Sequence, residues 1–345
     1  ALWNGNDPIL KERMFGLAGG EGNHGEDVKD YYFYLDSTPT HSYMKMLYKY
    51  PQRAFPYADL IAENRRRGIG GFEYELLDTG VFSDRRYFDV AVEYAKADPE
   101  DILIRLTITN HGDTPAPLTV LPTLWFRNTW SWGYPNGPMH DMPEKPQMMR
   151  LDDERIAAHH VGLGHYTLHV QDADEFLFTE NDTNHERLHG VPNATPYVKD
   201  AFHHYVIDQQ IDAVNTAQFG TKSAALYRLE IRAGATATIR LRLTSSALPA
   251  AFDGFDGIVA DRIAEADAFY KKIHTPGMSA DQKRVQRQAL AGMLWSKQLF
   301  YYDIEQWLQG DPIAAAPSAR HQGRNRDWHH LNNFDIISMP DTWEY

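Results

Sequence analysis

Residues 21–36 bring together side chains of the kinds that bind sugars. A run of carboxylate, amide and imidazole side chains surrounds two glycines, and none of these polar groups gains from burial in a core. The polar residues are Glu21, Asn23, His24, Glu26 and Asp27, and the aromatic residues that follow are Tyr31, Tyr32, Phe33 and Tyr34. In sugar sites, polar side chains bind hydroxyl groups and rings stack on C–H faces. The residue types leave a second interpretation open, a polar loop that leads into an aromatic strand.

Residues 327–344 and 172–182 are also rich in carboxylates. In the first segment the carboxylates alternate with amide and indole side chains: Asp327, Trp328, Asn332, Asn333, Asp335, Asp341, Trp343 and Glu344. This mixture favours sugar binding by part of the segment over a purely structural loop, whereas 172–182 is better interpreted as a solvated loop. Glycosidases work with two carboxyl groups, one of which is a general acid. Because a sequence gives no distance between carboxyl groups, these segments predict binding residues but no catalytic pair.

Other chemistries find little support in the sequence. Adjacent histidines occur at 159–160, 203–204 and 329–330, but neighbours on a strand point to opposite faces and no HExxH spacing is present. We therefore predict no metal and no cofactor. The sequence contains neither a glycine-rich phosphate loop followed by Lys-Ser/Thr nor a G-x-S-x-G elbow. A formal net charge of −13 argues against nucleic acid as a partner.

Composition is that of a soluble globular protein, with 43% hydrophobic and 23% charged residues in 345. The absence of cysteine excludes disulfides and suits a reducing compartment. No apolar run reaches the length of a membrane span, so we expect no membrane partner. The chain begins without methionine and stops abruptly at DTWEY, from which we expect a piece of a longer protein.

The sequence predicts strands in the first part of the chain and helices in the last part. Strand-length runs rich in Val, Ile, Tyr and Thr occupy 72–127 and return after 147, with turn residues between them. The alternation in 102–109 indicates antiparallel strands with one face on a core and the other in solvent. We therefore predict a mainly β protein built as an antiparallel sandwich over residues 1–252, with an insertion near 181–215.

Helices are predicted where the alternating strand pattern stops. Short helices are expected at 57–67, ended by Gly68, and at 197–208. After residue 252 the pattern becomes helical. Residues 253–278 are predicted to be a linker whose helix spans 257–273. Ser279 is a good N-cap for a second, long helix from 281 to about 309. The last residues, 323–345, are expected to form a loop. Residues 279–345 are thus predicted to begin a second domain.

Four stretches resemble one family over essentially the whole chain. ALWNG, EGNHGEDVKDYYFYLDSTPTHSYMKMLYKYPQ, LPTLWFRNTWSWG and LNNFDIISMPDTWEY look like the large bacterial proteins of glycoside hydrolase family 63, which includes the processing α-glucosidase I, or mannosyl-oligosaccharide glucosidase. The resemblance implies a β-super-sandwich, linker helices and an (α/α)6 barrel, of which 279–345 would be the truncated start with its first helix. It also implies an inverting exo-α-glucosidase with a carbohydrate substrate and, for a bacterial protein, a cytoplasmic location.

The resemblance also places the site. The general-acid aspartate, in a Trp-Asp element, and the distant glutamate base would both lie beyond Tyr345, in the missing barrel that this part would pack against. Asp341, Trp343, Glu344 and Tyr345 would precede the acid and line the sugar subsite, with Trp328 and Asp335 nearby. Asn23, His24, Glu26 and Asp27 would contact substrate from the sandwich, without transferring protons. The alternative is a non-catalytic carbohydrate-binding or packing module that uses Trp130, Trp132 and Trp328 as platforms.

Overall fold

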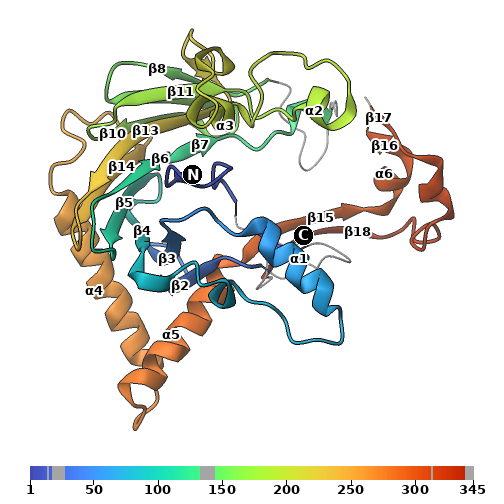
Figure 1. The fold of residues 1–345 in the computed structure, drawn as a ribbon. Helices are drawn as coiled ribbons and strands as arrows, with labels where there is room; N and C mark the ends of the chain where they lie inside the picture. Colours follow the sequence, from blue (N-terminus) through green and yellow to red (C-terminus); the bar gives the residue numbers. More distant parts are fainter. Residues whose placement is uncertain (14, 18–27, 133–143, 312–313, 339–345) are drawn as a thin grey trace.

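The computed structural model describes residues 1–13, 15–17, 28–132, 144–311 and 314–338, and it is mainly β (Figure 1). Every strand pair among these residues is antiparallel. The predicted mainly β, antiparallel class is therefore confirmed. No helix in the described ranges is both long enough and apolar enough to cross a membrane.

The larger sheet has nine strands in the described residues. In spatial order they are β12 (Phe219–Gly220), β8 (Gln147–Arg150), β9 (Arg155–His160), β10 (Gly164–Val170), β14 (Thr236–Thr244), β5 (Asp101–Asn110), β4 (Tyr87–Asp98), β3 (Tyr43–Pro51) and β2 (Tyr31–Ser37). Most neighbours in this order are also consecutive in sequence, as in antiparallel meanders. The stretch 42–50, whose apolar spacing fits both a strand and a helix, is strand β3 here.

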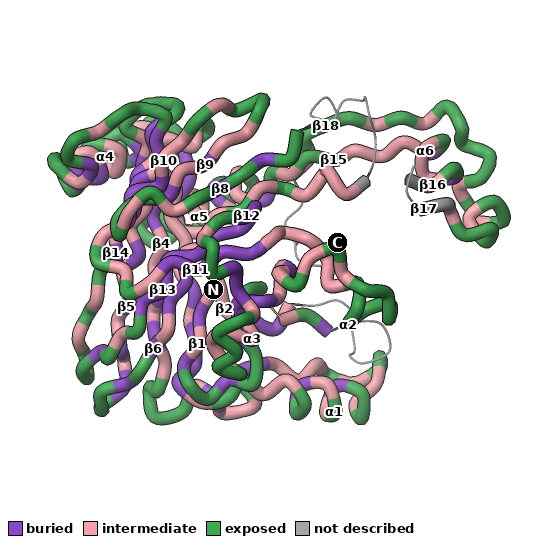
Figure 2. Tube along the Cα trace, turned by 90° about the horizontal axis from the view of Figure 1, so that it is seen from above, coloured by how far each residue is buried: buried purple, intermediate pink, exposed green. Residues whose placement is uncertain are grey.

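The smaller sheet has five strands in the described residues and packs against the larger one. Its strands are β1 (Leu2–Trp3), β6 (Ala116–Val120), β13 (Lys222–Ile231), β11 (Glu175–Thr179) and β7 (Thr123–Trp125). One hydrophobic core joins the sheets, with Tyr50, Phe88 and Ile108 from the larger and Phe178 and Tyr227 from the smaller. Figure 2 shows these buried residues concentrated in the strands of the body. This arrangement is compatible with the predicted sandwich.

Helices cover the outer faces of both sheets. Helix α4 (Phe255–Ile273) buries Phe255 and Val259 against Tyr43 and Leu103 of the larger sheet. The prediction that the second face of β5 is solvated was therefore wrong at Leu103, because α4 lies on that face. In the interval 181–215 lie α2 (His185–His189), α3 (Ala201–Val206) and a 3-10 turn at Ile211–Ala213, and α3 covers the smaller sheet.

Helix α5 (Ala280–Trp295) continues from α4 and is fastened to the edge strand β2. Ser279 forms the expected N-cap, with a reciprocal capping box to Gln282. Arg287 bonds Asp36 and Asp267, and the Trp295 ring stacks on Tyr34 at 5.0 Å. The helix pair is thus anchored to the body by charge and by ring contacts.

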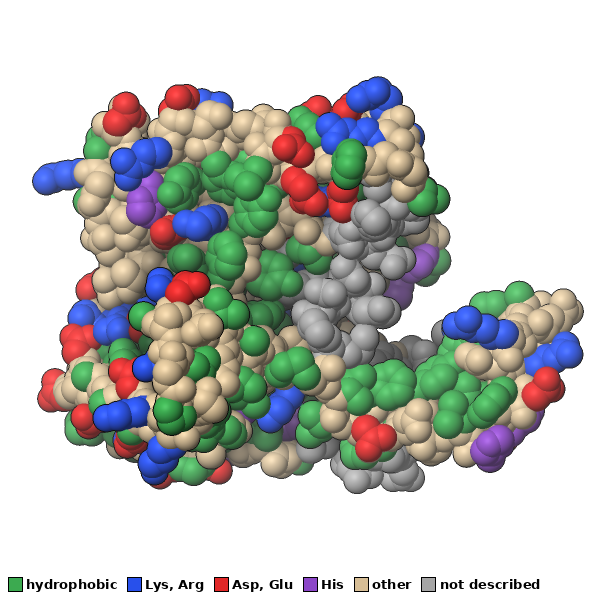
Figure 3. All heavy atoms as spheres, turned by 90° about the horizontal axis from the view of Figure 1, so that it is seen from below, with side chains coloured by type: hydrophobic (Ala, Val, Ile, Leu, Met, Phe, Trp, Pro, Cys, Tyr) green, Lys and Arg blue, Asp and Glu red, His purple; other side chains and the backbone are tan. Residues whose placement is uncertain are grey.

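Beyond α5 an arm projects from the body (Figure 1). It is built from β15 (Lys297–Asp303), α6 (Ile304–Gln309), β16 (Gly310–Asp311), β17 (Ala314–Ala315), a 3-10 turn at Ser318–Gln322 and β18 (Asn332–Ser338). Strands β15 and β18 pair as a two-stranded ribbon. Hydrophobic side chains are exposed along it, including Phe300, Phe334 and Ile336 (Figure 3).

Two predictions in this region were wrong. The helix predicted from 281 to about 309 ends at Trp295, and residues 297–303 are strand β15; residues 332–338, predicted as loop, are strand β18. The reason is the pairing of the two segments, with Lys297 opposite Ser338 and Asp303 opposite Asn332. Periodicity detects no such long-range pairing. The described residues contain no (α/α)6 barrel, which stays a prediction, as do the domain boundaries.

Candidate functional site

Three strands of the smaller sheet end together and position a group of polar side chains. Lys222, the first residue of β13, lies opposite both Trp125 at the end of β7 and Thr179 at the end of β11. The segments that leave β7 and β11, 126–132 and 180–184, therefore start at the same end of the sheet, on either side of β13. Asn181 ties them together, because its side-chain amide donates to the carbonyl of Phe126 at 2.9 Å.

Asp182 is the centre of this group. Its Oδ1 accepts hydrogen bonds from Asn128 Nδ2 at 2.6 Å and from the indole Nε1 of Trp130 at 3.1 Å. Asn128 also donates to the carbonyl of Asn181 and accepts from the backbone N–H of Ser131. The short 3-10 turn Trp130–Trp132 is thereby held against the end of β11.

Glu180 and Lys145 extend the group toward solvent. Glu180 Oε2 accepts from Thr221 Oγ1 at 2.6 Å and pairs with Lys145 Nζ at 3.0 Å. Lys145 also lies 4.0 Å from Asp182 Oδ2 and 5.7 Å from the centre of the Trp130 ring. The carboxylates are mostly covered, with 15% of the Glu180 and 23% of the Asp182 side chain exposed. We call Asn128, Trp130, Lys145, Glu180 and Asp182 the strand-end cluster.

The chemistry of this cluster suits hydroxyl groups. Carboxylate oxygens accept hydrogen bonds from hydroxyls, the lysine ammonium donates to them, and an indole offers a ring face. The mutual hydrogen bonds fix these side chains before a ligand arrives, which lowers the cost of binding. Both carboxylates are already engaged by donors, so the cluster is better suited to holding a sugar than to transferring a proton.

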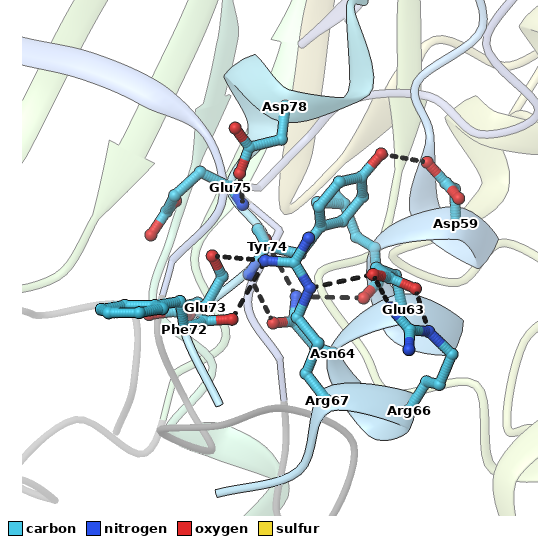
Figure 4. Close-up of polar contacts among 11 residues, drawn as sticks. Asp59, Glu63, Asn64, Arg66, Arg67, Phe72, Glu73, Tyr74, Glu75 and Asp78 are labelled. Carbon is cyan, nitrogen blue, oxygen red and sulfur yellow. Dashed lines mark hydrogen bonds and ion pairs between the residues drawn. The ribbon is translucent and has the colours of Figure 1, made fainter. Parts of the chain in front are cut away.

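A second polar group lies at the side of helix α1 (Tyr57–Arg67). Arg67 donates to the carbonyls of Phe72 and Glu73, and the Asn64 side chain pairs with the backbone of Tyr74, as Figure 4 shows. Glu73 in turn binds Lys29, which is buried. These contacts hold the connection from α1 to the 3-10 turns Leu76–Thr79 and Ser83–Arg85.

Next to Lys29, Asp30 is also buried and anchors the N-terminal residues. Its Oδ1 accepts from Tyr48 at 2.5 Å and lies 3.5 Å from Lys11 Nζ. Desolvation on burial lowers the pKa of Lys11, and the Asp30 and Asp7 carboxylates oppose that shift. The whole group is enclosed, so its role is to join the N-terminal residues to β3.

The structure describes two of the site residues predicted from sequence. Trp328, with 53% of its surface exposed, precedes β18 and lies against the His330 ring at 5.9 Å. Asp335 lies within β18, exposed and opposite Phe300. Both belong to the arm, and no hydrogen bond or ion pair within the described ranges joins either to the strand-end cluster.

The other predicted site residues lie outside the described residues. These are Asn23, His24, Glu26, Asp27, Asp341, Trp343, Glu344 and Tyr345. Their proposed contacts with substrate stay predictions.

Glu180 and Asp182 were missed, because the segment 172–182 was interpreted as a solvated loop. Their partners come from residues 128–145 and 221, far away in sequence. A usable signal was the string LPTLWFRNTWSWG, which contains Asn128 and Trp130. A run of polar residues placed after a buried strand, as in EFLFTEND, is a second signal for a strand-end site.

The histidine pairs do not assemble a metal site in the described part of the chain, where no group of three or more potential ligands is found. His159 stacks on His165 at 4.2 Å across β9 and β10, whereas its neighbour His160 stacks on Phe126 at 5.5 Å. The two adjacent imidazoles thus have separate surroundings.

No protein-family model matches the chain. It is similar to an uncharacterized protein of Saccharomyces cerevisiae (strain ATCC 204508 / S288c), YMR196W, with 39% identity over 395 aligned positions. The alignment covers all of this chain but only 36% of that relative, so the chain spans about a third of the relative's length.

Two of the solved structures that match the chain resemble it faintly. A protein from the human microbiome that is named as a kojibiose phosphorylase matches at 8% identity and a TM-score of 0.24, over 63% of this chain and 23% of its own. A polysaccharide lyase, BACCELL_00875, matches at 10% identity and a TM-score of 0.29, over 76% of this chain and 34% of its own. TM-scores this low establish neither a common fold nor an activity.

Proposed function

We propose that this chain is the β part of a glycoside hydrolase similar to family 63, an inverting exo-α-glucosidase that acts on α-glucosides or oligosaccharides. In this proposal the general acid and base belong to a helical barrel supplied by the rest of the polypeptide. The relative's greater length leaves room for such a region. The four family-like stretches in the sequence support the same assignment.

The observation that carries the proposal is the strand-end cluster. It combines two carboxylates, an amide, a lysine and an indole in one hydrogen-bonded group. Figures 1 and 2 show α2, which follows Asp182, on the side of the body from which the arm projects. A barrel that continues from the arm would therefore approach the body on the side of this cluster.

The inverting mechanism indicates which part of the protein would hold the catalytic carboxyl groups and which part would bind the sugar. A single displacement needs a water between two carboxyl groups about 6.5–9.5 Å apart, one of which is protonated. The engaged carboxylates of the strand-end cluster suit binding of a sugar hydroxyl instead, so the β part would help to position the substrate.

The test is the stereochemistry of hydrolysis by the full-length protein. Incubated with maltose and other α-linked glucose disaccharides and followed by proton NMR, it should release the β anomer first. First release of the α anomer would overturn the inverting assignment, and binding without hydrolysis would favour the non-catalytic binding module. The 345 residues alone are expected to hydrolyse no glycoside.

The part played by the cluster is tested by Asp182→Asn in the full-length protein. It should raise KM several-fold and leave kcat nearly unchanged, because it weakens ground-state and transition-state binding alike. The control is Asp153→Asn, which changes a carboxylate that is 91% exposed and paired only with Arg150 on the surface. Equal KM and kcat values for the two variants would show that the strand-end cluster does not bind the substrate.

A further inference from the structure

A hollow of about 490 Å³ lies on the outer face of the larger sheet, next to the segment that leads into α4. Asp152, Glu154 and Arg155 line it from the β8–β9 turn and β9, His169 lines it from β10, and Phe252 and Asp253 line it from the connecting segment. No residue of the strand-end cluster takes part in it. Its volume falls in the range of small-ligand pockets, roughly 300–1,000 Å³.

His169 is the least exposed polar residue that lines this hollow. Only 7% of its surface is exposed, yet neither ring nitrogen has a hydrogen-bond partner within the described part of the chain. The ring lines the hollow, and neither nitrogen is among the fully enclosed side-chain atoms that lack a partner, so both nitrogens reach the space of the hollow. A ligand in the hollow would bond them in place of solvent.

The charges around His169 are already matched. Its cross-strand neighbours are Arg242 on β14 and Arg155 on β9. Arg242 makes two hydrogen bonds to Asp101, at 2.6 and 2.8 Å, and a third to the carbonyl of Ala251. Arg155 Nε donates to Asp152 at 2.7 Å. An anionic ligand would therefore find no free cation here.

What remains for a ligand is one imidazole, two exposed carboxylates and a ring. Glu154 and Asp253 form no ion pair with any described residue. Phe252 is held in place against the ring of Phe255, at 6.1 Å. Carboxylates only accept hydrogen bonds, whereas a neutral imidazole both donates and accepts. A hydroxyl can donate to the carboxylates and can do either with the imidazole.

We propose that this hollow is a carbohydrate-binding site for a neutral mono- or disaccharide, with His169 as its central hydrogen-bonding residue. Glu154 and Asp253 accept from sugar hydroxyls, and Phe252 faces the C–H surface of the ring. Burial and the two arginines lower the pKa of His169, which keeps the imidazole neutral at pH 7. The site goes beyond the proposed hydrolase, because its binding requires no catalytic carboxylate.

The test follows His169 itself in the full-length protein. The exchange of each imidazole C2 proton with deuterated solvent, measured by mass spectrometry during a maltose titration, should slow several-fold and saturably at His169. His111, whose Nε2 is bonded to Asp89 at 2.9 Å, serves as the internal control and should not respond. Protection at His169 without protection at His111 supports the site.

Variants of exposed carboxylates, which leave folding intact, sharpen the test. Asp253→Asn should raise the maltose concentration needed for half-protection of His169 several-fold, and Asp153→Asn should not change it. No protection by maltose, equal effects of the two variants, or protection by the diamine putrescine in place of maltose would overturn the proposal. Hydrolysis is assayed separately, so failure of this site and failure of the proposed function are distinguishable.

Discussion

Arg242 and Asp101 form an ion pair between neighbouring strands β14 and β5, under the segment that leads into α4. Only 8% and 11% of these two side chains are exposed. The guanidinium also binds the carbonyl of Ala251, so each of these groups has a partner in a nearly closed space. The pair therefore fixes the connecting segment that forms one wall of the hollow at His169.

Removing one partner of this pair should be costly. Arg242→Met leaves the Asp101 carboxylate buried without its counter-charge, and a loss of about 3–5 kcal/mol in the free energy of unfolding is expected. The control is Arg155→Met, whose pair with Asp152 is about half exposed and is expected to contribute less than about 1 kcal/mol. Urea denaturation of both variants measures the difference, and similar losses would contradict the buried role of Arg242.

At the same scale, sequence reasoning identified residue types but not their neighbours. Trp130 was recognised as a possible sugar platform, whereas Asp182, which accepts its indole hydrogen bond, was assigned to a solvated loop. The two residues are brought together only by the pairing of β7 and β11 with β13. No local pattern encodes that proximity.

At the scale of the elements, the sequence predicted helix ends correctly where capping residues next to the helix determine them. Helix α1 was predicted with its observed bounds and its end at Gly68, and Ser279 caps α5 as expected. The predicted long helix is wrong where β15 pairs with β18, because the paired residues are 29 to 41 positions apart in the chain, from Asp303 with Asn332 to Lys297 with Ser338. Strand pairing of this kind overrides helical spacing of apolar residues.

Helix α4 is expected to contribute strongly to the stability of the larger sheet. Phe255 is 2% exposed and packs on Tyr43, Ala95 and Leu103, so Phe255→Ala should lower the free energy of unfolding by about 3–5 kcal/mol. Phe72, which is 94% exposed, is the matched control, and Phe72→Ala should change it by less than about 0.5 kcal/mol. Thermal and urea unfolding monitored by circular dichroism give both values. A small effect at Phe255 would mean that α4 is only loosely attached.

For the molecule as a whole, acidity should weaken the fold through three imidazoles, of which His169 is buried and His41 and His160 are partly buried. Burial lowers the pKa of His41, His160 and His169, and neighbouring lysine, histidine or arginine side chains lower these values further. In the unfolded chain these groups titrate near 6.5. The unfolded state therefore binds protons first as the pH falls, so the stabilisation is complete above pH 6.5 and is lost as the pH falls toward the lower folded values.

Two buried carboxyls act in the opposite sense. Burial raises the pKa of Asp7 and of Asp36, so their protonation in acid favours the folded state, which binds these protons before the unfolded chain does. At His169, Asp152 and Asp101 oppose the stronger effects of burial, Arg155 and Arg242. The change of the free energy of unfolding near pH 6 therefore combines the histidines with these carboxyls and with the Ala1 amino group, whose pKa burial lowers to about 6. A variant at one histidine separates the contribution of that residue.

We expect the free energy of unfolding to fall between about pH 7.5 and about pH 5.5, and His169→Asn to make that fall smaller. Asparagine does not titrate, so this variant abolishes one of the proton-binding differences between the folded and unfolded states. His321→Asn, at an exposed position in the arm, should keep the slope of the parent protein. Urea unfolding at several pH values measures the slopes directly. A His169 variant with an unchanged slope would show that this imidazole binds protons equally in the folded and unfolded protein. A parent whose stability rises toward pH 5.5 would show that the carboxyls outweigh the histidines.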